Sequence, residues 1–198
     1  MQKKPYISMP VIRRLPRYYR FLRHLDKRGV TRISSKELSE KMGFTASQVR
    51  QDFNCFGGFG QQGYGYNVSN LTGEIKRIMG IDRKHTIIIV GAGNIGHALT
   101  NFPGFAETGF EVKALFDVNE DLIGTEIKGH PVLDVKDMDE YIRENQIDIG
   151  VIAARRSAAQ EIADRMCAAG IRGIWNFVPL DITTSVPIEN VHLSESLS

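Results

Sequence analysis

A glycine-rich segment followed at a set distance by an acid is the clearest chemical signal in the chain. Gly91, Gly93 and Gly96 follow an apolar, β-branched run at 86–90, and Asp117 lies 21 residues after Gly96. In this pattern the first glycine makes a tight turn, the second lets the backbone approach a pyrophosphate, and the third packs a helix against a strand. An acid at this interval accepts hydrogen bonds from ribose hydroxyls and repels a 2′-phosphate. The segment therefore predicts a dinucleotide site that favours NAD(H) over NADP(H).

The elements around this segment predict a parallel sheet with helices on both faces. Strands are expected at 86–90, 111–116, 147–153 and 173–177, and helices at 138–144 and 157–169. Ligands of such sheets lie beyond the carboxyl ends of the strands. The expected cofactor-binding residues are therefore Gly91, Ala92, Gly93, Asn94, Ile95, Gly96, Asp117, Val118, Ala153, Ala154, Asn176, Phe177 and Pro179. Asp117 could instead simply end a strand, and Phe177 suits the core equally well.

Charge is divided unevenly along the chain. Residues 1–80 hold 15 Lys and Arg against 5 Asp and Glu, a net charge of +10, whereas residues 81–198 hold 10 against 18, a net charge of −8. This split predicts two domains, 1–80 and 81–198, of which the first faces a polyanion. A basic surface without a partner is the alternative.

Helix and turn signals in the basic half predict a helix-turn-helix. A helix is expected to open at Pro16 and to end at Gly29, and capping boxes at 34–37 and 45–48 open two more helices. The last helix carries side chains that suit DNA, because Arg pairs with guanine, Gln pairs with adenine and Ser can hold a phosphate. These residues are Ser47, Gln48, Arg50 and Gln51. A three-helix packing module has a similar pattern.

Residues 56–66 contain five glycines and four aromatic residues. The alternation predicts a hairpin with 60–63 at its tip, which after a helix-turn-helix is a wing that can enter a minor groove. A flexible glycine linker is the alternative. The wing residues expected to bind DNA are Phe59, Gly60, Gln61, Gln62, Gly63 and Tyr64. A short helix capped by Asn67 or Ser69 then leads to Gly80.

Other function classes receive little support from the sequence. No apolar run reaches the ~18 to 20 residues that span a bilayer, and the amino-terminal residues do not form a signal peptide. Cys55 and Cys167 are far apart and the five histidines are scattered, so neither a metal site nor a disulfide scaffold is expected. No catalytic constellation stands out. We therefore expect a cytoplasmic protein that is not an enzyme, with no membrane and no metal partner.

Three functions remain compatible with these signals. The first is a DNA-binding protein that senses NAD(H). The second is a small NAD-dependent oxidoreductase with a basic appendage, and the third is a winged-helix sensor of another nucleotide, such as a coenzyme A derivative.

Seven short motifs resemble the Rex family of bacterial redox-sensing transcriptional repressors along essentially the whole chain. They are SQVRQDF at 47–53, FGGFG at 56–60, GYGY at 63–66, VGAGNIG at 90–96, FDV at 116–118, AQ at 159–160 and NFVP at 176–179. The resemblance implies an α/β protein with an amino-terminal winged-helix DNA-binding domain and a carboxyl-terminal Rossmann-type, doubly wound parallel sheet. It also implies a homodimer that binds palindromic operator DNA and releases it when NADH replaces NAD⁺.

Two positions depart from the resemblance in a network of three residues that the family uses as a link. Some members join an arginine of the first helix, a tyrosine after the cofactor helix and an acid of the partner's tail. Arg20 matches the arginine, but Phe102 and His192 occupy the other two positions. The wing has Gln61 and Gln62 where a basic pair is common, so a shallower salt dependence is expected.

Overall fold

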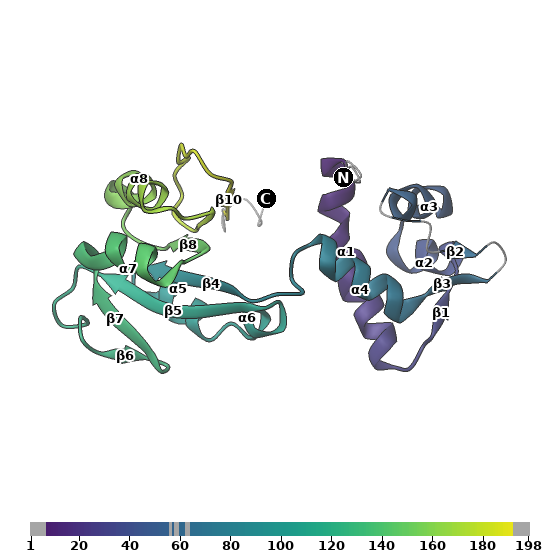
Figure 1. Ribbon diagram of the computed structural model, residues 1–198, viewed down its shortest axis with the longest axis horizontal. Coiled ribbons are helices and arrows are strands. Elements are labelled where there is room, and N and C mark those ends of the chain that lie inside the picture. Colours follow the sequence, from purple (N-terminus) through teal and green to yellow (C-terminus); the bar gives the residue numbers. More distant parts are fainter. Residues whose placement is uncertain (1–6, 56, 58–59, 62–63, 192–198) are drawn as a thin grey trace. The chain divides into compact units, whose positions relative to one another are not determined.

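The computed structural model describes residues 7–55, 57, 60–61 and 64–191, which form two compact units that divide between Asp82 and Arg83 (Figure 1). The first unit contains α1 (Met9–Lys27), β1 (Arg32–Ile33), α2 (Ser35–Met42), α3 (Ala46–Asn54), β2 (Gly60–Gln61), β3 (Gly65–Asn67) and α4 (Val68–Ile78). α1 packs along α4, and α2 packs against α3. Tyr18, Phe53 and Leu71 are among the fully buried side chains of its core.

α1 is longer than expected, because it begins at Met9 and contains Pro16 in its interior. Pro10 lies in the first turn, where the missing N–H has no partner to lose. Leu15, like Leu22, is fully buried, so the apolar stripe continues on both sides of Pro16. Packing of this stripe outweighs the hydrogen bond that proline removes. The expectation that Pro16 opens the helix was therefore wrong.

α2 and α3 begin at the residues that their capping signals indicated. The Ser34 hydroxyl accepts the Glu37 N–H at 3.1 Å, and the Glu37 carboxylate accepts the Ser34 N–H at 2.8 Å. α2 ends at Gly43, whose φ is +68°, and Thr45 accepts the Gln48 N–H at 3.1 Å to open α3. The expected helix-turn-helix is therefore present.

The wing is a three-stranded antiparallel sheet in the order β1-β3-β2. β1 was not expected from the sequence. Gly60 and Gln61 pair with Tyr66 and Gly65, so they form β2 rather than the tip of the hairpin, which corrects that expectation. Gly65 has a φ of +70°, and a Cβ there would lie 2.6 Å from the Ile33 carbonyl oxygen, so glycine permits this strand register.

The second unit is a seven-stranded sheet in the order β10-β9-β8-β4-β5-β7-β6, parallel except for β6 (Figure 1). Its strands are β4 (His85–Val90), β5 (Phe110–Asp117), β6 (Glu126–Ile127), β7 (His130–Asp134), β8 (Ile149–Ile152), β9 (Gly173–Asn176) and β10 (Ile188–Asn190). Its helices are α5 (Asn94–Thr100), α6 (Pro103–Glu107), α7 (Met138–Asn145) and α8 (Ala159–Ala169), with the 3₁₀ turns η1 (Val135–Asp137) and η2 (Arg156–Ala158). The order β7-β5-β4-β8-β9-β10 is that of a dinucleotide-binding Rossmann sheet.

Alternate residues of β4 point to two separate cores, as a doubly wound sheet requires. Ile88 and Val90 pack with residues of α7 and α8, whereas Ile87 and Ile89 pack with Leu99 of α5 and with α6. Both cores bury mainly aliphatic side chains. The switch in strand order between β5 and β8 lies at β4, where such sheets place their ligand.

Candidate dinucleotide pocket and nucleic-acid interface

The glycine loop turns tightly at the carboxyl end of β4. The Gly91 N–H donates to the Phe116 carbonyl at 2.7 Å, and Gly91 has a φ of +106°. A Cβ at Gly91 would lie 2.4 Å from the Ala153 carbonyl oxygen, and one at Gly96 would lie 2.0 Å from the Gly91 carbonyl oxygen. Both positions therefore need glycine, because backbone occupies the space of a side chain. The space around Gly93, at the start of α5, is open.

A cavity of about 760 Å³ opens beside this loop, between the ends of β4, β5 and β8. Six expected cofactor residues line it: Gly91, Gly93, Asp117, Val118, Ala153 and Ala154. Nine further residues also line it: Val90, Phe116, Asn119, Leu122, Val135, Arg155, Ser157, Ala158 and Ile162. None of these nine was assigned as a cofactor-binding residue from the sequence. The apolar members give the cavity a wall that suits an aromatic base, and the glycine loop supplies backbone for a phosphate.

Asp117 lies where β5 ends and faces this cavity. Its Oδ2 accepts the Ala92 N–H at 2.6 Å, and its Oδ1 accepts the N–H groups of Val118 and Asn119 at 2.8 and 2.9 Å. The carboxylate thus ties its own turn to the glycine loop. Because a carboxylate has about four acceptor positions, it retains capacity for a ligand hydroxyl.

The remaining expected cofactor residues lie outside the cavity lining. Asn94 and Ile95 are exposed on the first turn of α5, and Ala92 is buried in the loop. Asn176 is completely buried, and its amide bonds Val178, Leu180 and Asn190. Phe177 packs on Trp175 with ring centroids 4.8 Å apart, and Pro179 is exposed. Asn176 therefore shapes the loop after β9 with its own side chain.

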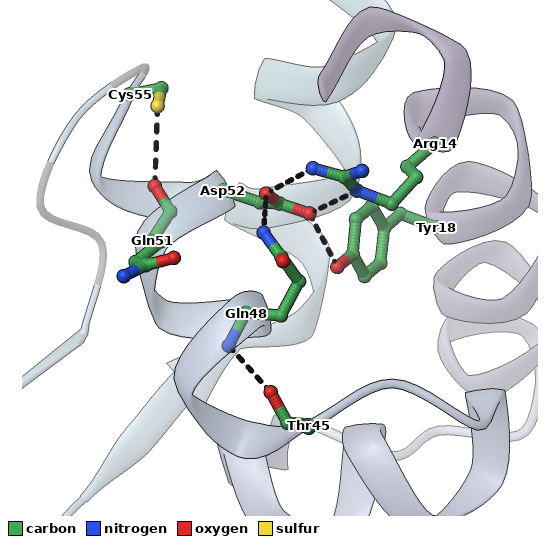
Figure 2. Close-up of polar contacts among 7 residues, drawn as sticks. All are labelled: Arg14, Tyr18, Thr45, Gln48, Gln51, Asp52 and Cys55. Atoms are coloured by element: carbon green, nitrogen blue, oxygen red, sulfur yellow. Dashed lines mark hydrogen bonds and ion pairs between the residues drawn. The ribbon is translucent and has the colours of Figure 1, made fainter. Parts of the chain in front are cut away.

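The exposed face of α3 carries three of the four side chains expected to bind DNA. Ser47, Arg50 and Gln51 are exposed, and the Arg50 guanidinium donates to the Ser35 hydroxyl at 3.2 Å. Gln48 is only half-exposed, and its Nε2 donates to Asp52 Oδ1 at 2.9 Å (Figure 2). The Gln48 side chain therefore does not complete the second capping box, because it turns towards the following turn of its own helix.

Asp52 is a buried carboxylate in α3 that the sequence analysis missed. Its side chain is 1% exposed, and Arg14 of α1 bonds both of its oxygens at 2.7 Å (Figure 2). The Tyr18 hydroxyl donates to Oδ2 at 2.9 Å. Burial raises the pKa of Asp52, but the hydrogen bonds from Arg14, Tyr18 and Gln48 outweigh it and hold that pKa below its usual range. An acid between Val49 and Phe53, on the apolar side of the helix, was the signal available in the sequence.

The wing residues are described only in part. Tyr64 is 70% exposed, and Arg32 of β1 donates to its carbonyl oxygen at 3.3 Å and lies over its ring. Gly60 and Gln61 lie in β2. The expected residues Phe59, Gln62 and Gly63 lie outside the described residues.

The three expected switch positions occupy different parts of the chain. Arg20 is exposed on α1 and lines a basic hollow of about 320 Å³ with Arg17, His24 and Lys41. Phe102 is 53% exposed in the second unit and lies edge-to-face on Phe105. His192 lies outside the described residues.

The part of the chain that the structure describes offers neither a metal site nor a membrane-spanning helix. No group of three or more His, Cys, Asp or Glu side chains there could hold a metal ion. Within the same part of the chain, no helix has both the length and the apolar character needed to cross a membrane.

Comparisons with known proteins match both units. Residues 6–54 match the family described as putative DNA-binding protein N-terminus, and residues 82–180 match the family described as CoA binding domain. A crystal structure of RSP in complex with beta-NAD⁺ and operator DNA has a TM-score of 0.94 and 52% identity, covering 97% of this chain and 89% of that one. A structure of RSP in complex with beta-NADH has a TM-score of 0.88 and 50% identity, covering 96% and 90%. RSP is described as a Rex-family repressor.

The fold defines a class of proteins in which a winged helix is joined to a Rossmann unit, which confirms the expected fold class. The redox-sensing transcriptional repressor Rex of Clostridium botulinum strain Hall is 55% identical to this chain, covering all of it and 95% of that protein. The repressor of the same name from Clostridium acetobutylicum is 54% identical, covering 100% and 93%. The chain belongs to the Rex family, as its motifs indicated.

Proposed function

We propose that this protein is a redox-sensing transcriptional repressor that binds palindromic operator DNA and releases it when NADH binds in place of NAD⁺. The observation that carries the proposal is full-length similarity to Rex repressors, at 55% identity. We assign DNA binding to a domain of residues 1–80 and dinucleotide binding to a domain of residues 81–198. The exposed face of α3 and the cavity beside the glycine loop support this division of roles.

The residues of the second unit fit a dinucleotide. We propose that the glycine loop 91–96 holds the pyrophosphate through backbone N–H groups, since Gly91, Gly93 and Gly96 carry no side chains that would cover these groups. Asp117 and Val118 would hold the adenosine ribose, and Ala153 and Ala154 would line the middle of the dinucleotide. Asn176, Phe177 and Pro179 would shape the nicotinamide side. The signal that the protein would sense is whether the nicotinamide ring of the bound dinucleotide is oxidised or reduced.

Release of DNA requires that NADH distinguish two arrangements of the protein. A ligand shifts an equilibrium only by its difference in affinity for the two states. The dihydronicotinamide ring is neutral whereas the oxidised ring is cationic, so an apolar surrounding favours NADH. We propose that NADH binds more tightly to the arrangement in which the two recognition helices do not match the operator.

A homodimer follows from the palindromic site, because twofold DNA symmetry calls for two copies of α3. The half-sites would lie about 34 Å, one helical turn, or a multiple of this apart. An apolar hollow of about 460 Å³ on the second unit, lined by Phe105, Phe110, Ile174 and Trp175 among others, supports a second copy as the occupant of this face. Such a surface is typical of subunit contacts.

We also propose that the protein catalyses no reaction and acts in the cytoplasm, where a bacterial repressor meets its DNA. Its curated relatives are named repressors. The one carboxylate that faces the cavity from the described residues, Asp117, already accepts three backbone N–H groups. Hydride transfer to a small carbonyl compound would support the oxidoreductase alternative instead.

A sensor of a coenzyme A derivative is the second candidate, favoured by the description of the family that matches residues 82–180. The two candidates differ at Asp117, because a carboxylate beside the ribose disfavours extra ribose phosphates. Tighter binding of coenzyme A than of NADH would favour this second candidate.

Selection followed by titration tests the proposal. Duplexes are selected from a randomised palindromic library with the protein, and the best is labelled for fluorescence anisotropy at fixed salt. We expect specific binding that NADH reverses and that NAD⁺ and coenzyme A leave largely intact. Asp117→Arg should weaken NADH binding while leaving DNA binding unchanged. No selected duplex, or release by coenzyme A alone, would contradict the proposed function.

A further inference from the structure

The Asp52 carboxylate uses all of its hydrogen-bonding capacity within the first unit. Oδ1 accepts from Arg14 Nη2 and Gln48 Nε2, and Oδ2 accepts from Arg14 Nε and the Tyr18 hydroxyl (Figure 2). A carboxylate has about four acceptor positions, so these four donors satisfy it completely. The group can therefore bind neither water nor DNA without losing an existing partner.

The same contact restrains the side chain of Gln48. A glutamine reads adenine with a donor and an acceptor presented together at the base edge. Here the amide bends along the helix to the residue four positions later and is only half-exposed. Turning it outward would leave a buried carboxylate one donor short, which is costly in a region of low dielectric constant.

Two residues of α1 hold the other side of this carboxylate. Arg14 forms a two-point ion pair with Asp52, which also cancels a negative charge on a helix that faces phosphates. The Tyr18 ring packs on Phe44, in the turn before α3, and on Phe53 within α3, with centroids 5.5 and 4.9 Å apart. α1 therefore holds both the turn and the recognition helix.

We propose that Gln48 is a positioning residue, which with Asp52, Arg14 and Tyr18 locks α3 to α1 and sets the angle at which the exposed side chains meet the bases. Gln48 is not itself a base reader. This role replaces the adenine contact expected from the sequence, and it rests on the proposed function in one respect, that α3 binds DNA.

Base preference separates a positioning residue from a base reader. The full-length protein and its Gln48→Ala variant are compared on the duplex selected by the wild type and on all of its single-base-pair substitutions. If Gln48 is a positioning residue, its removal lowers DNA affinity on every duplex by a similar factor, about tenfold for one hydrogen bond to a charged group. If Gln48 is a base reader, its removal abolishes the base preference at one base pair and leaves the preferences at the other base pairs unchanged.

Tyr18→Phe extends the test to a side chain that is fully buried in the first unit. We expect Tyr18→Phe to lower DNA affinity on every duplex by a similar factor, as Gln48→Ala does. The double variant should lose less affinity than the product of the two single factors, because both residues act through one carboxylate. Gln51→Ala is the matched control, since this glutamine lies on the same helix and its side chain points away from Asp52 (Figure 2). When Gln51→Ala is combined with Tyr18→Phe, the loss of DNA affinity should equal the product of the two single losses. Circular dichroism of each variant checks that α3 is folded.

Three results would overturn the assignment. Loss of preference at a single base pair in Gln48→Ala would make Gln48 a base reader. Unchanged DNA affinity in Gln48→Ala would show that Gln48 does not position α3. Unchanged DNA affinity in Tyr18→Phe would show that the contact with α1 does not set the angle of α3. A wild-type protein that selects no duplex would instead contradict the proposed function, so the two failures are distinguishable.

Discussion

Removal of the Asp52 carboxylate should strongly destabilise the first unit, because four hydrogen bonds converge on it. Asp52→Ala deprives the buried Tyr18 hydroxyl of its acceptor and the Arg14 guanidinium of its ion partner. Breaking a buried ion pair from one side costs about 3–5 kcal/mol. The Arg14 side chain is 24% exposed and can be hydrated in part, so we expect a loss of about 3 kcal/mol in the free energy of unfolding.

Urea denaturation measures this loss with two separate signals. Trp175, the single tryptophan, lies in the second unit, so its fluorescence reports that unit, whereas circular dichroism reports the helices of both. With a urea dependence of about 1 kcal/mol/M for a small domain, the midpoint of the first unit should fall by about 3 M. An equal shift in Trp175 fluorescence would mean that the units unfold together, and the loss could then be read from either signal.

Glu40→Ala is the control for loss of charge alone, because this carboxylate lies exposed on α2. It should change the free energy of unfolding by no more than about 0.5 kcal/mol. If Asp52→Ala changes the midpoint as little as this control does, the Asp52 contacts do not stabilise the fold and the reasoning is refuted.

Three further outcomes are expected. Wild-type protein should lose stability relative to Asp52→Asn as pH falls below about 5. The reason is that folded Asp52 has a pKa below its ordinary 3.8, so it binds a proton less readily than Asp52 of the unfolded chain. Equal pH profiles of the two proteins in urea melts would contradict this expectation. Gly96→Ala should weaken NADH at least ~10-fold in fluorescence titrations, because its Cβ would overlap the Gly91 carbonyl oxygen, and wild-type affinity would show that the loop adapts. Arg50→Ala should cost about 1–3 kcal/mol on the selected duplex in anisotropy titrations, and unchanged affinity would remove Arg50 from base readout.

The features that the sequence predicted well depend on short stretches of chain. The caps at Ser34 and Thr45 depend on side chains that reach only three residues along the helix, so their types and spacing were sufficient. The glycine loop is equally local, and its Asp117 follows from the length of one strand-helix-strand unit. These signals also gave the family resemblance, which the comparisons confirmed.

The features that were missed depend on contacts between distant residues. Pro16 was expected to open a helix, but burial of Leu15 and Leu22 carries the helix through it. The role of Asp52 depends on Arg14, which lies 38 residues earlier, and no local pattern links the two. Leu122 lines the dinucleotide cavity because the turn after β5 brings it there, so its position required the folded sheet.

Reciprocal linkage between NADH and DNA tests the central claim most directly. If NADH releases DNA, DNA must weaken NADH binding by the same factor, since coupling between two sites is symmetric in free energy. The affinity for NADH is therefore measured with the full chain, alone and with a saturating amount of the selected duplex. We expect the duplex to weaken NADH binding by a factor of about 5 to 150 and to leave NAD⁺ binding nearly unchanged. Equal NADH affinity with and without the duplex would contradict redox sensing by this protein.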